Sequence, residues 1–111
     1  MMSFKFIFEV RVADDKDEEF IENWHKMSIP IQEYDGAMGT RLHKKQGEEH
    51  TYIAIAEWES QEDREMAMKD ISEDGDSDRA KRVKKRGDNG DFGEVTILGE
   101  VDEISTVLPP V

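Results

Sequence analysis

Large apolar residues occupy every second position between residues 4 and 12, and mostly charged residues lie between them. A period of two places the alternate side chains on one face of a strand. The residues on this face are Phe4, Phe6, Phe8, Val10 and Val12. The pattern therefore predicts a first strand with one strongly apolar face.

The period then changes to about 3.6, which is typical of a helix. We expect Asp14 or Asp15 to cap its first turn and the helix to end near Pro30. Its apolar residues are Phe20, Trp24, Met27 and Ile31, with Ile21 beside them. This stripe predicts a helix that covers the apolar face of the first strand.

Residues 38–59 have the pattern of an antiparallel hairpin, preceded by a turn at residues 34–36. One face of its second strand carries Tyr52, Ala54, Ala56 and Trp58. Two alanines between two large aromatic residues leave space above the sheet. The space predicts either a ligand pocket or a place where a helix packs closely against the sheet.

Ser60 ends this strand and is expected to cap a second helix, because acidic residues follow at positions 62 and 63. Met66, Ala67 and Ile71, with Met68 adjoining, are expected to face the core.

Residues 72–91 form a charged insert in which an acidic run precedes a basic run from Arg79 to Arg86. This order of charges predicts a short surface helix, anchored by Ala80 and Val83. The basic run could instead bind phosphate groups or a partner protein. No aromatic residue interleaves the charges and the whole chain is acidic, so we expect no binding of nucleic acid.

Residues 92–104 alternate again and predict a fourth strand, in which Gly99 could mark a bulge. The C-terminal tail, residues 105–111, is expected either to lie on a partner subunit or to fray.

The predicted order of elements is βαββαβ, the ferredoxin-like α+β arrangement of a four-stranded antiparallel sheet with both helices on one face. The opposite face of the sheet would then carry Ile7, Ile53 and Ile55 among charged residues. Pairing of two such sheets would bury this half-apolar surface, which predicts a homodimer. A length of 111 residues fits a single domain over residues 1–111.

Composition narrows the function classes. The chain has 15 Lys and Arg against 27 Asp and Glu, a net charge of −12, which repels nucleic acid and anionic lipid. It has no cysteine, so disulfides, thiolate metal sites and a cysteine nucleophile are excluded. No apolar run approaches the roughly 18 residues of a membrane span, and we expect a soluble protein of the cytoplasm.

Three segments of the sequence resemble the antibiotic biosynthesis monooxygenase family of small dimeric α/β barrels. They are residues 36–43, the strand end Ala56-Glu57-Trp58-Glu59-Ser60, and the helix that follows. The resemblance spans about residues 4–104 apart from the charged insert. It implies the fold already reached from the order of elements, and it implies a dimer.

The family includes cofactor-free oxygenases of polycyclic phenols and quinols, haem-degrading enzymes and proteins without known activity. Haem-degrading relatives have an Asn late in the first strand and a His in the second helix. Here Val10 holds the strand position and the helix after Ser60 has no His. The resemblance therefore implies oxygenation without a cofactor, of an aromatic, phenolic or quinol-like molecule; the alternative is a dimer that binds a small apolar ligand without catalysis.

A cofactor-free oxygenase needs an apolar pocket and a group that removes a proton near neutral pH, for which histidine is the first candidate. We expect His43 or His25 to be this base and Trp58 to lie at the reacting centre; His50 is expected at the surface. The residues expected to contact the substrate are Tyr52, Trp24, Phe8 and Met66. No histidine has partners at zinc-site spacing, so no metal is expected.

Overall fold

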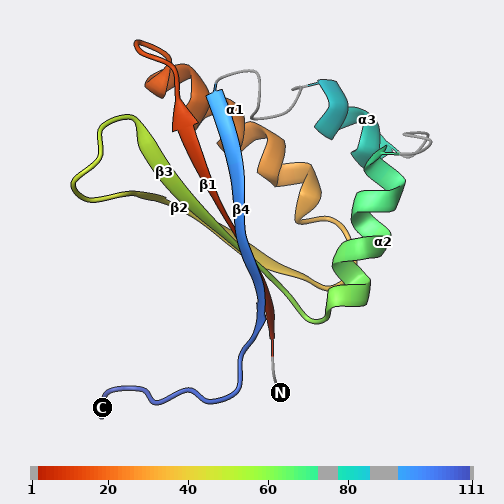
Figure 1. Ribbon diagram of the computed structural model, residues 1–111. Coiled ribbons are helices and arrows are strands. Elements are labelled where there is room, and N and C mark those ends of the chain that lie inside the picture. The colour runs from red at the N-terminus through yellow and green to blue at the C-terminus, as the bar shows by residue number, and fades with distance from the viewer. Residues whose placement is uncertain (1–2, 73–77, 86–92, 111) are drawn as a thin grey trace.

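The computed structural model describes residues 3–72, 78–85 and 93–110, which contain four strands and three helices (Figure 1). In chain order they are β1 (Phe4–Val12), α1 (Asp17–Ile31), β2 (Ala37–Lys44), β3 (Thr51–Trp58), α2 (Gln61–Ser72), α3 (Asp78–Lys85) and β4 (Gly93–Asp102). The predicted βαββαβ order is confirmed, and α3 is the short helix predicted in the charged insert.

The strands form one antiparallel sheet in the order β2-β3-β1-β4. The described helices all lie on one side of this sheet (Figure 1). The fold is therefore the expected ferredoxin-like α+β arrangement. In the register of the central pair, Phe6 lies opposite Ala56 and Ile7 lies opposite Ile55. The aromatic face of β1 and the alanine face of β3 thus point together toward the helices.

Two clusters of buried residues fill the space between sheet and helices. One joins residues of β1, α1 and β3, namely Val10, Val12, Phe20, Trp24, Tyr52 and Ala54. The other joins Phe4, Trp58 and Ala67 at the opposite end of the same strands. Apolar residues of β1 and β3 take part in both clusters, as the period-two pattern predicts.

Helix α1 begins later than the sequence suggested. Its N-cap is Lys16, so the prediction that Asp14 or Asp15 caps the helix is wrong. Asp15 has a φ of 66°, which places it in a left-handed turn before the helix. The first helical turn carries Asp17, Glu18 and Glu19, whose negative charges interact favourably with the positive end of the helix dipole. The helix ends at Ile31, as expected from Pro30.

The second helix begins as predicted, because the backbone N–H of Asp63 donates to Ser60 Oγ at 3.2 Å. Its buried side differs from the expected one only at Met66. Met66 is 71% exposed, whereas Ala67 is 2% exposed and Met68 is partly buried. Residues 64, 67, 68 and 71 share one face of a helix, and residue 66 lies on the opposite face.

Strand β4 contains the bulge suggested by Gly99. Ile7 pairs with Gly99 while Phe8 pairs with Ile97, so Leu98 is the extra residue. The bulge breaks the simple alternation that the sequence predicts. Beyond it, Glu100 pairs with Phe6 and therefore lies on the side of the sheet that the helices cover.

Within the charged insert, α3 packs against α1 and α2. Ala80 and Val83 are 0% and 6% exposed, which confirms them as its anchors. The acidic run at 73–77 and the glycines at 87 and 90 lie outside the described residues. Residues 103–110 have no regular secondary structure, and this tail leads away from the sheet (Figure 1).

Candidate functional site

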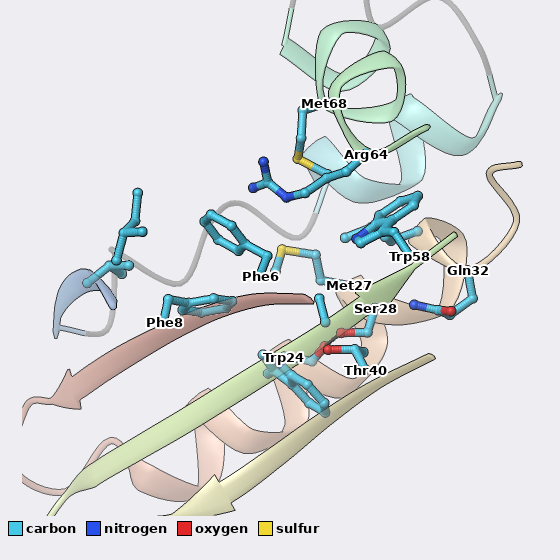
Figure 2. A pocket seen from close by; sticks show the side chains of 14 residues that line it. Phe6, Phe8, Trp24, Met27, Ser28, Gln32, Thr40, Trp58, Arg64 and Met68 are labelled. Atoms are coloured by element: carbon cyan, nitrogen blue, oxygen red, sulfur yellow. Dashed lines mark hydrogen bonds between the residues drawn. The ribbon is translucent and has the colours of Figure 1, made fainter. Parts of the chain in front are cut away.

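A cavity of about 480 Å³ lies between the sheet and the helices α1 and α2 (Figure 2). A volume of this size is typical of small-molecule sites. Every strand and both long helices contribute to its wall. The lining residues are Phe6, Phe8, Trp24, Met27, Ser28, Ile31, Gln32, Thr40, Ala56, Trp58, Arg64, Met68, Val95 and Ile97.

The cavity exists because small residues lie opposite large ones across the strands. Ala56 pairs with Phe6 on one side and with Thr40 on the other. The rings of Phe6 and Phe8 are tilted by 45° with centroids 5.8 Å apart, and they form a continuous aromatic wall. Of the two alanines singled out in the sequence, Ala56 lines the cavity, and Ala54 is fully buried in the neighbouring cluster. Ala56 thus borders the predicted space, whereas the space above Ala54 is filled by large side chains.

Trp58 forms the end of the cavity nearest α2 and is only 2% exposed. It is the last residue of β3, and its neighbour in β1 is Phe4. Val95 and Ile97 belong to the edge strand β4 and are 46% and 64% exposed. The cavity is thus closed at the Trp58 end and more accessible along β4.

Few polar groups reach this cavity. Ser28 Oγ donates to Trp24 O at 2.7 Å and Thr40 Oγ1 donates to Ile55 O at 3.3 Å, so both hydroxyl protons are engaged with backbone. Gln32 Oε1 accepts a hydrogen bond from the N–H of Gly39 at 2.8 Å, which leaves its amide N–H groups as donors.

Arg64 is the cation at this site. It extends from α2 over the ring of Phe6, with its guanidinium carbon 3.6 Å from the ring centroid (Figure 2). Its side chain is 19% exposed, and its Nη1 lies 3.9 Å from Glu100 Oε1. Burial lowers the pKa of Arg64 from its ordinary value because desolvation disfavours the charged form.

The β4 bulge explains why Glu100 comes near Arg64. Without the extra residue Leu98, strict alternation would place Glu100 on the other side of the sheet from Ile97. At 3.9 Å the carboxylate attracts the guanidinium but is too far for a hydrogen bond. The described lining residues include no Asp, Glu or His.

The structure brings three of the predicted site residues together at the cavity, Trp58, Trp24 and Phe8. It does not bring the histidines there. His43 pairs with Ile53, on the face of the sheet away from the helices, and its Nδ1 lies 3.2 Å from Ile53 O. His25 is exposed on α1.

Met66 and Tyr52 also lie elsewhere. Met66 points to the outside of α2. Met68 lines the cavity, where the sequence suggested Met66. Tyr52 packs on Phe20 with ring centroids 5.5 Å apart, in the other buried cluster. Sequence reasoning missed Arg64 and Gln32. Arg64 precedes Ala67, Met68 and Ile71 at helical spacing, and this spacing was the signal that could have found it.

A second polar cluster surrounds Asp17 at the start of α1. Tyr52 Oη donates to Asp17 Oδ2 at 2.6 Å, and His50 Nδ1 lies 2.7 Å from Asp17 Oδ1. These hydrogen bonds, that of Tyr52 first, lower the pKa of Asp17. In turn the bond to Asp17 raises the pKa of Tyr52 to about 12 and raises that of His50 above its ordinary value. The cluster links the β2–β3 turn, β3 and α1.

Among the described residues, no group of three or more His, Cys, Asp or Glu side chains is arranged to hold a metal ion. No helix in the same ranges combines the length and apolar character that crossing a bilayer requires.

Solved structures similar to this one cover nearly the whole chain. A protein from Bordetella bronchiseptica, proposed to be an antibiotic biosynthesis monooxygenase, has a TM-score of 0.70 and 15% identity over 96% of this chain and 100% of its own. A protein from Pseudomonas aeruginosa has a TM-score of 0.67 and 16% identity, and the match covers 95% of this chain and 97% of that protein. SnoaB from Streptomyces nogalater, a cofactor-independent oxygenase, has a TM-score of 0.64 and 15% identity. The match covers 97% of this chain and 98% of SnoaB.

At such low identities these structures show a shared fold. No protein of curated function has a detectably similar sequence. The sequence model of the antibiotic biosynthesis monooxygenase family matches residues 3–69, which is more than half of the chain and includes most of the cavity wall. This chain therefore belongs to the antibiotic biosynthesis monooxygenase family.

Proposed function

We propose that the protein is a cofactor-independent monooxygenase of an electron-rich aromatic molecule, which binds in the cavity between sheet and helices. The observation that carries this proposal is the cavity itself, about 480 Å³ in volume and walled mainly by aromatic and aliphatic side chains. Membership of the family and the fold shared with a cofactor-independent oxygenase support the same activity.

The proposed reaction needs only the substrate and oxygen. A phenol or an activated CH₂ group loses a proton, and the resulting anion transfers one electron to O₂. The substrate radical and superoxide then combine and take up a proton to form a hydroperoxide. Loss of water leaves a carbonyl, so that CH₂ and O₂ become C=O and H₂O. The residues supply an apolar enclosure that holds the two reactants together and excludes bulk water.

The first step requires removal of a proton, and the described lining residues offer no carboxylate or imidazole for it. His43 and His25, the bases expected from the sequence, lie outside the cavity. We therefore propose that substrates acidic enough to ionise in water are used, and that the proton leaves to solvent along the exposed β4 side of the cavity. Trp58, Trp24 and Phe8 remain the proposed aromatic contacts.

We also propose that the enzyme works as a homodimer in the cytoplasm. The uncovered face of the sheet carries the partly buried Ile7, Ile53 and Ile55. Ion pairs lie beside them, such as Lys5 with Glu57 at 3.8 Å and Lys45 with Glu9 at 2.9 Å. An apolar strip with charged borders suits pairing with a second copy of itself.

Oxygen consumption tests the activity. We expect the metal-free protein to consume dissolved oxygen saturably with one class among hydroquinones, anthrones and polyphenols. Met68→Trp fills the cavity and should abolish this uptake. Met66→Trp is the matched control on the outside of α2, and uptake should persist in it.

An alternative function is binding of a small aromatic ligand without catalysis. The absence of an acid or base among the described lining residues favours this alternative. Oxygen uptake at the buffer rate with every substrate, while ligands still bind and Met68→Trp prevents binding, would establish the alternative and overturn the oxygenase.

A further inference from the structure

We infer that Arg64 makes this cavity selective for flat aromatic anions, in which a ring system carries one acidic oxygen. The inference rests on the proposed function only in placing the ligand in the same cavity. It does not require that the ligand reacts with oxygen.

The guanidinium of Arg64 has no hydrogen-bonded acceptor in the part of the chain that the structure describes. Its side chain is 19% exposed, it lies against the Phe6 ring, and its carboxylate neighbour Glu100 is at 3.9 Å. None of its hydrogen-bond donors meets an acceptor among the described residues at hydrogen-bond distance. A partly buried cation without a hydrogen-bonded protein acceptor has N–H donors left for a ligand, and an oxygen that carries negative charge is the strongest acceptor for them.

The cavity wall around this cation is aromatic and apolar. Phe6, Phe8, Trp24 and Trp58 supply aromatic faces, and Met27 and Met68 supply adaptable apolar contacts (Figure 2). An aliphatic anion would leave the aromatic surface poorly filled. A neutral aromatic molecule would bury the guanidinium further without a negative charge to pair with it. An aromatic anion satisfies both parts of the site.

The charge of the whole molecule is opposite to that of Arg64. With a net charge of −12 the protein repels anions at long range. Arg64 is therefore a local exception, placed among apolar side chains that partly shield it from water and strengthen an ion pair. The acidic oxygen could be a carboxylate or the oxygen of an ionised phenol or enol, and these sources are separated by the choice of probes.

The test compares matched anionic and neutral ligands by isothermal titration calorimetry at pH 7.5. The carboxylate 2-naphthoate is compared with neutral 2-naphthamide, and ionised 2-hydroxy-1,4-naphthoquinone is compared with neutral 1,4-naphthoquinone. We expect at least one anion to bind about tenfold or more tightly than its neutral partner, as for a charge-assisted hydrogen bond. The pair that shows the preference identifies the acidic oxygen. The two indole N–H signals in ¹H–¹⁵N spectra locate binding, because both tryptophans line the cavity.

Variants assign the preference to Arg64. Arg64→Gln should bring the anion and the neutral ligand to equal affinity, and Arg64→Lys should retain part of the preference. Lys69→Gln makes the same change of charge at an exposed position of the same helix and should leave the preference intact. Thermal unfolding checks that each variant is folded.

Equal affinities in the wild-type protein, failure of all four ligands to bind, or a preference that survives in Arg64→Gln would overturn the inference. The wild-type comparison needs no variant, so it decides even if Arg64→Gln does not fold. Anion binding without oxygen uptake would leave this inference standing and remove the oxygenase. Oxygen uptake with neutral substrates that is unchanged in Arg64→Gln would support the oxygenase and overturn the inference about Arg64.

Discussion

The two ends of the helix-covered face of the sheet are built from the same strands, and they are filled differently. At the packed end, Val10, Val12, Phe20 and Tyr52 fill the space completely, with Phe20 0% exposed. At the hollow end, Phe6, Ala56, Trp58 and Arg64 surround a cavity of about 480 Å³. Trp24 belongs to both and divides them.

Their polar groups differ in the same way. At the packed end, Asp17 accepts from Tyr52 at 2.6 Å and contacts His50 at 2.7 Å, so each charge or dipole has a partner. At the hollow end, Arg64 has a carboxylate neighbour only at 3.9 Å among the described residues. A polar group that is hydrogen-bonded within the protein contributes to the fold, whereas a cation without a hydrogen-bonded protein acceptor beside a cavity is available to a ligand.

Replacing one phenylalanine by alanine at each end should give the largest difference in the free energy of unfolding between the packed end and the hollow end. Phe20→Ala should lower the free energy of unfolding by about 3–5 kcal/mol, because it creates a new cavity in close-packed surroundings. Phe6→Ala should cost only about 1–2 kcal/mol, because Phe6 already borders empty space. Urea unfolding followed by circular dichroism measures both. An equal loss would mean that the hollow end is packed like the other.

Removal of a single hydroxyl tests the polar cluster of the packed end. Tyr52→Phe should lower the free energy of unfolding by about 1–2 kcal/mol, because the Asp17 carboxylate loses a short hydrogen bond. Tyr34→Phe removes a similar bond, to Asp70, from a more exposed tyrosine and should cost less. If Tyr52→Phe proved neutral in urea unfolding, the cluster would not stabilise this end.

The sequence alone predicted the features of the two ends that depend on periodicity. The period of two in β1 placed Phe6, Phe8 and Val10 on one face, and the helical period placed Phe20 and Trp24 above them. Ala54 and Ala56 indicated that space could exist over β3. Which alanine would border the cavity depended on where Phe20 and Trp24 project, and that is a tertiary property.

The charged residues could not be placed from their spacing alone. Arg64 occupies a core-facing position of α2, yet an arginine in a helix is usually assigned to the solvent side. Glu100 changes face because Leu98 is inserted, and alternation gives no sign of the inserted residue apart from Gly99. The side of the sheet on which His43 lies depends on the register that pairs Leu42 with Ala54.

The smallest expected effect is a pH dependence of stability that belongs to the packed end. The contact with Asp17 raises the folded-state pKa of His50 above the ordinary value of 6.5. The stabilisation from His50 is therefore fully present below about pH 6.5, and it is lost as the pH rises through the raised folded-state pKa. Asp17 acts in the opposite direction, since its folded-state pKa is lowered from 3.8 and its contribution is lost only as the pH falls through that lowered value.

The urea midpoint of the wild-type protein should therefore decline between about pH 6 and pH 8.5, and His50→Asn should flatten this decline. Asparagine suits the test because it tolerates the left-handed backbone of His50, whose φ is 57°. His43→Asn removes an exposed imidazole from the other face of the sheet and should keep the decline. A decline that persists in His50→Asn would assign the pH dependence to other groups, and the packed end would lose its electrostatic distinction from the hollow end.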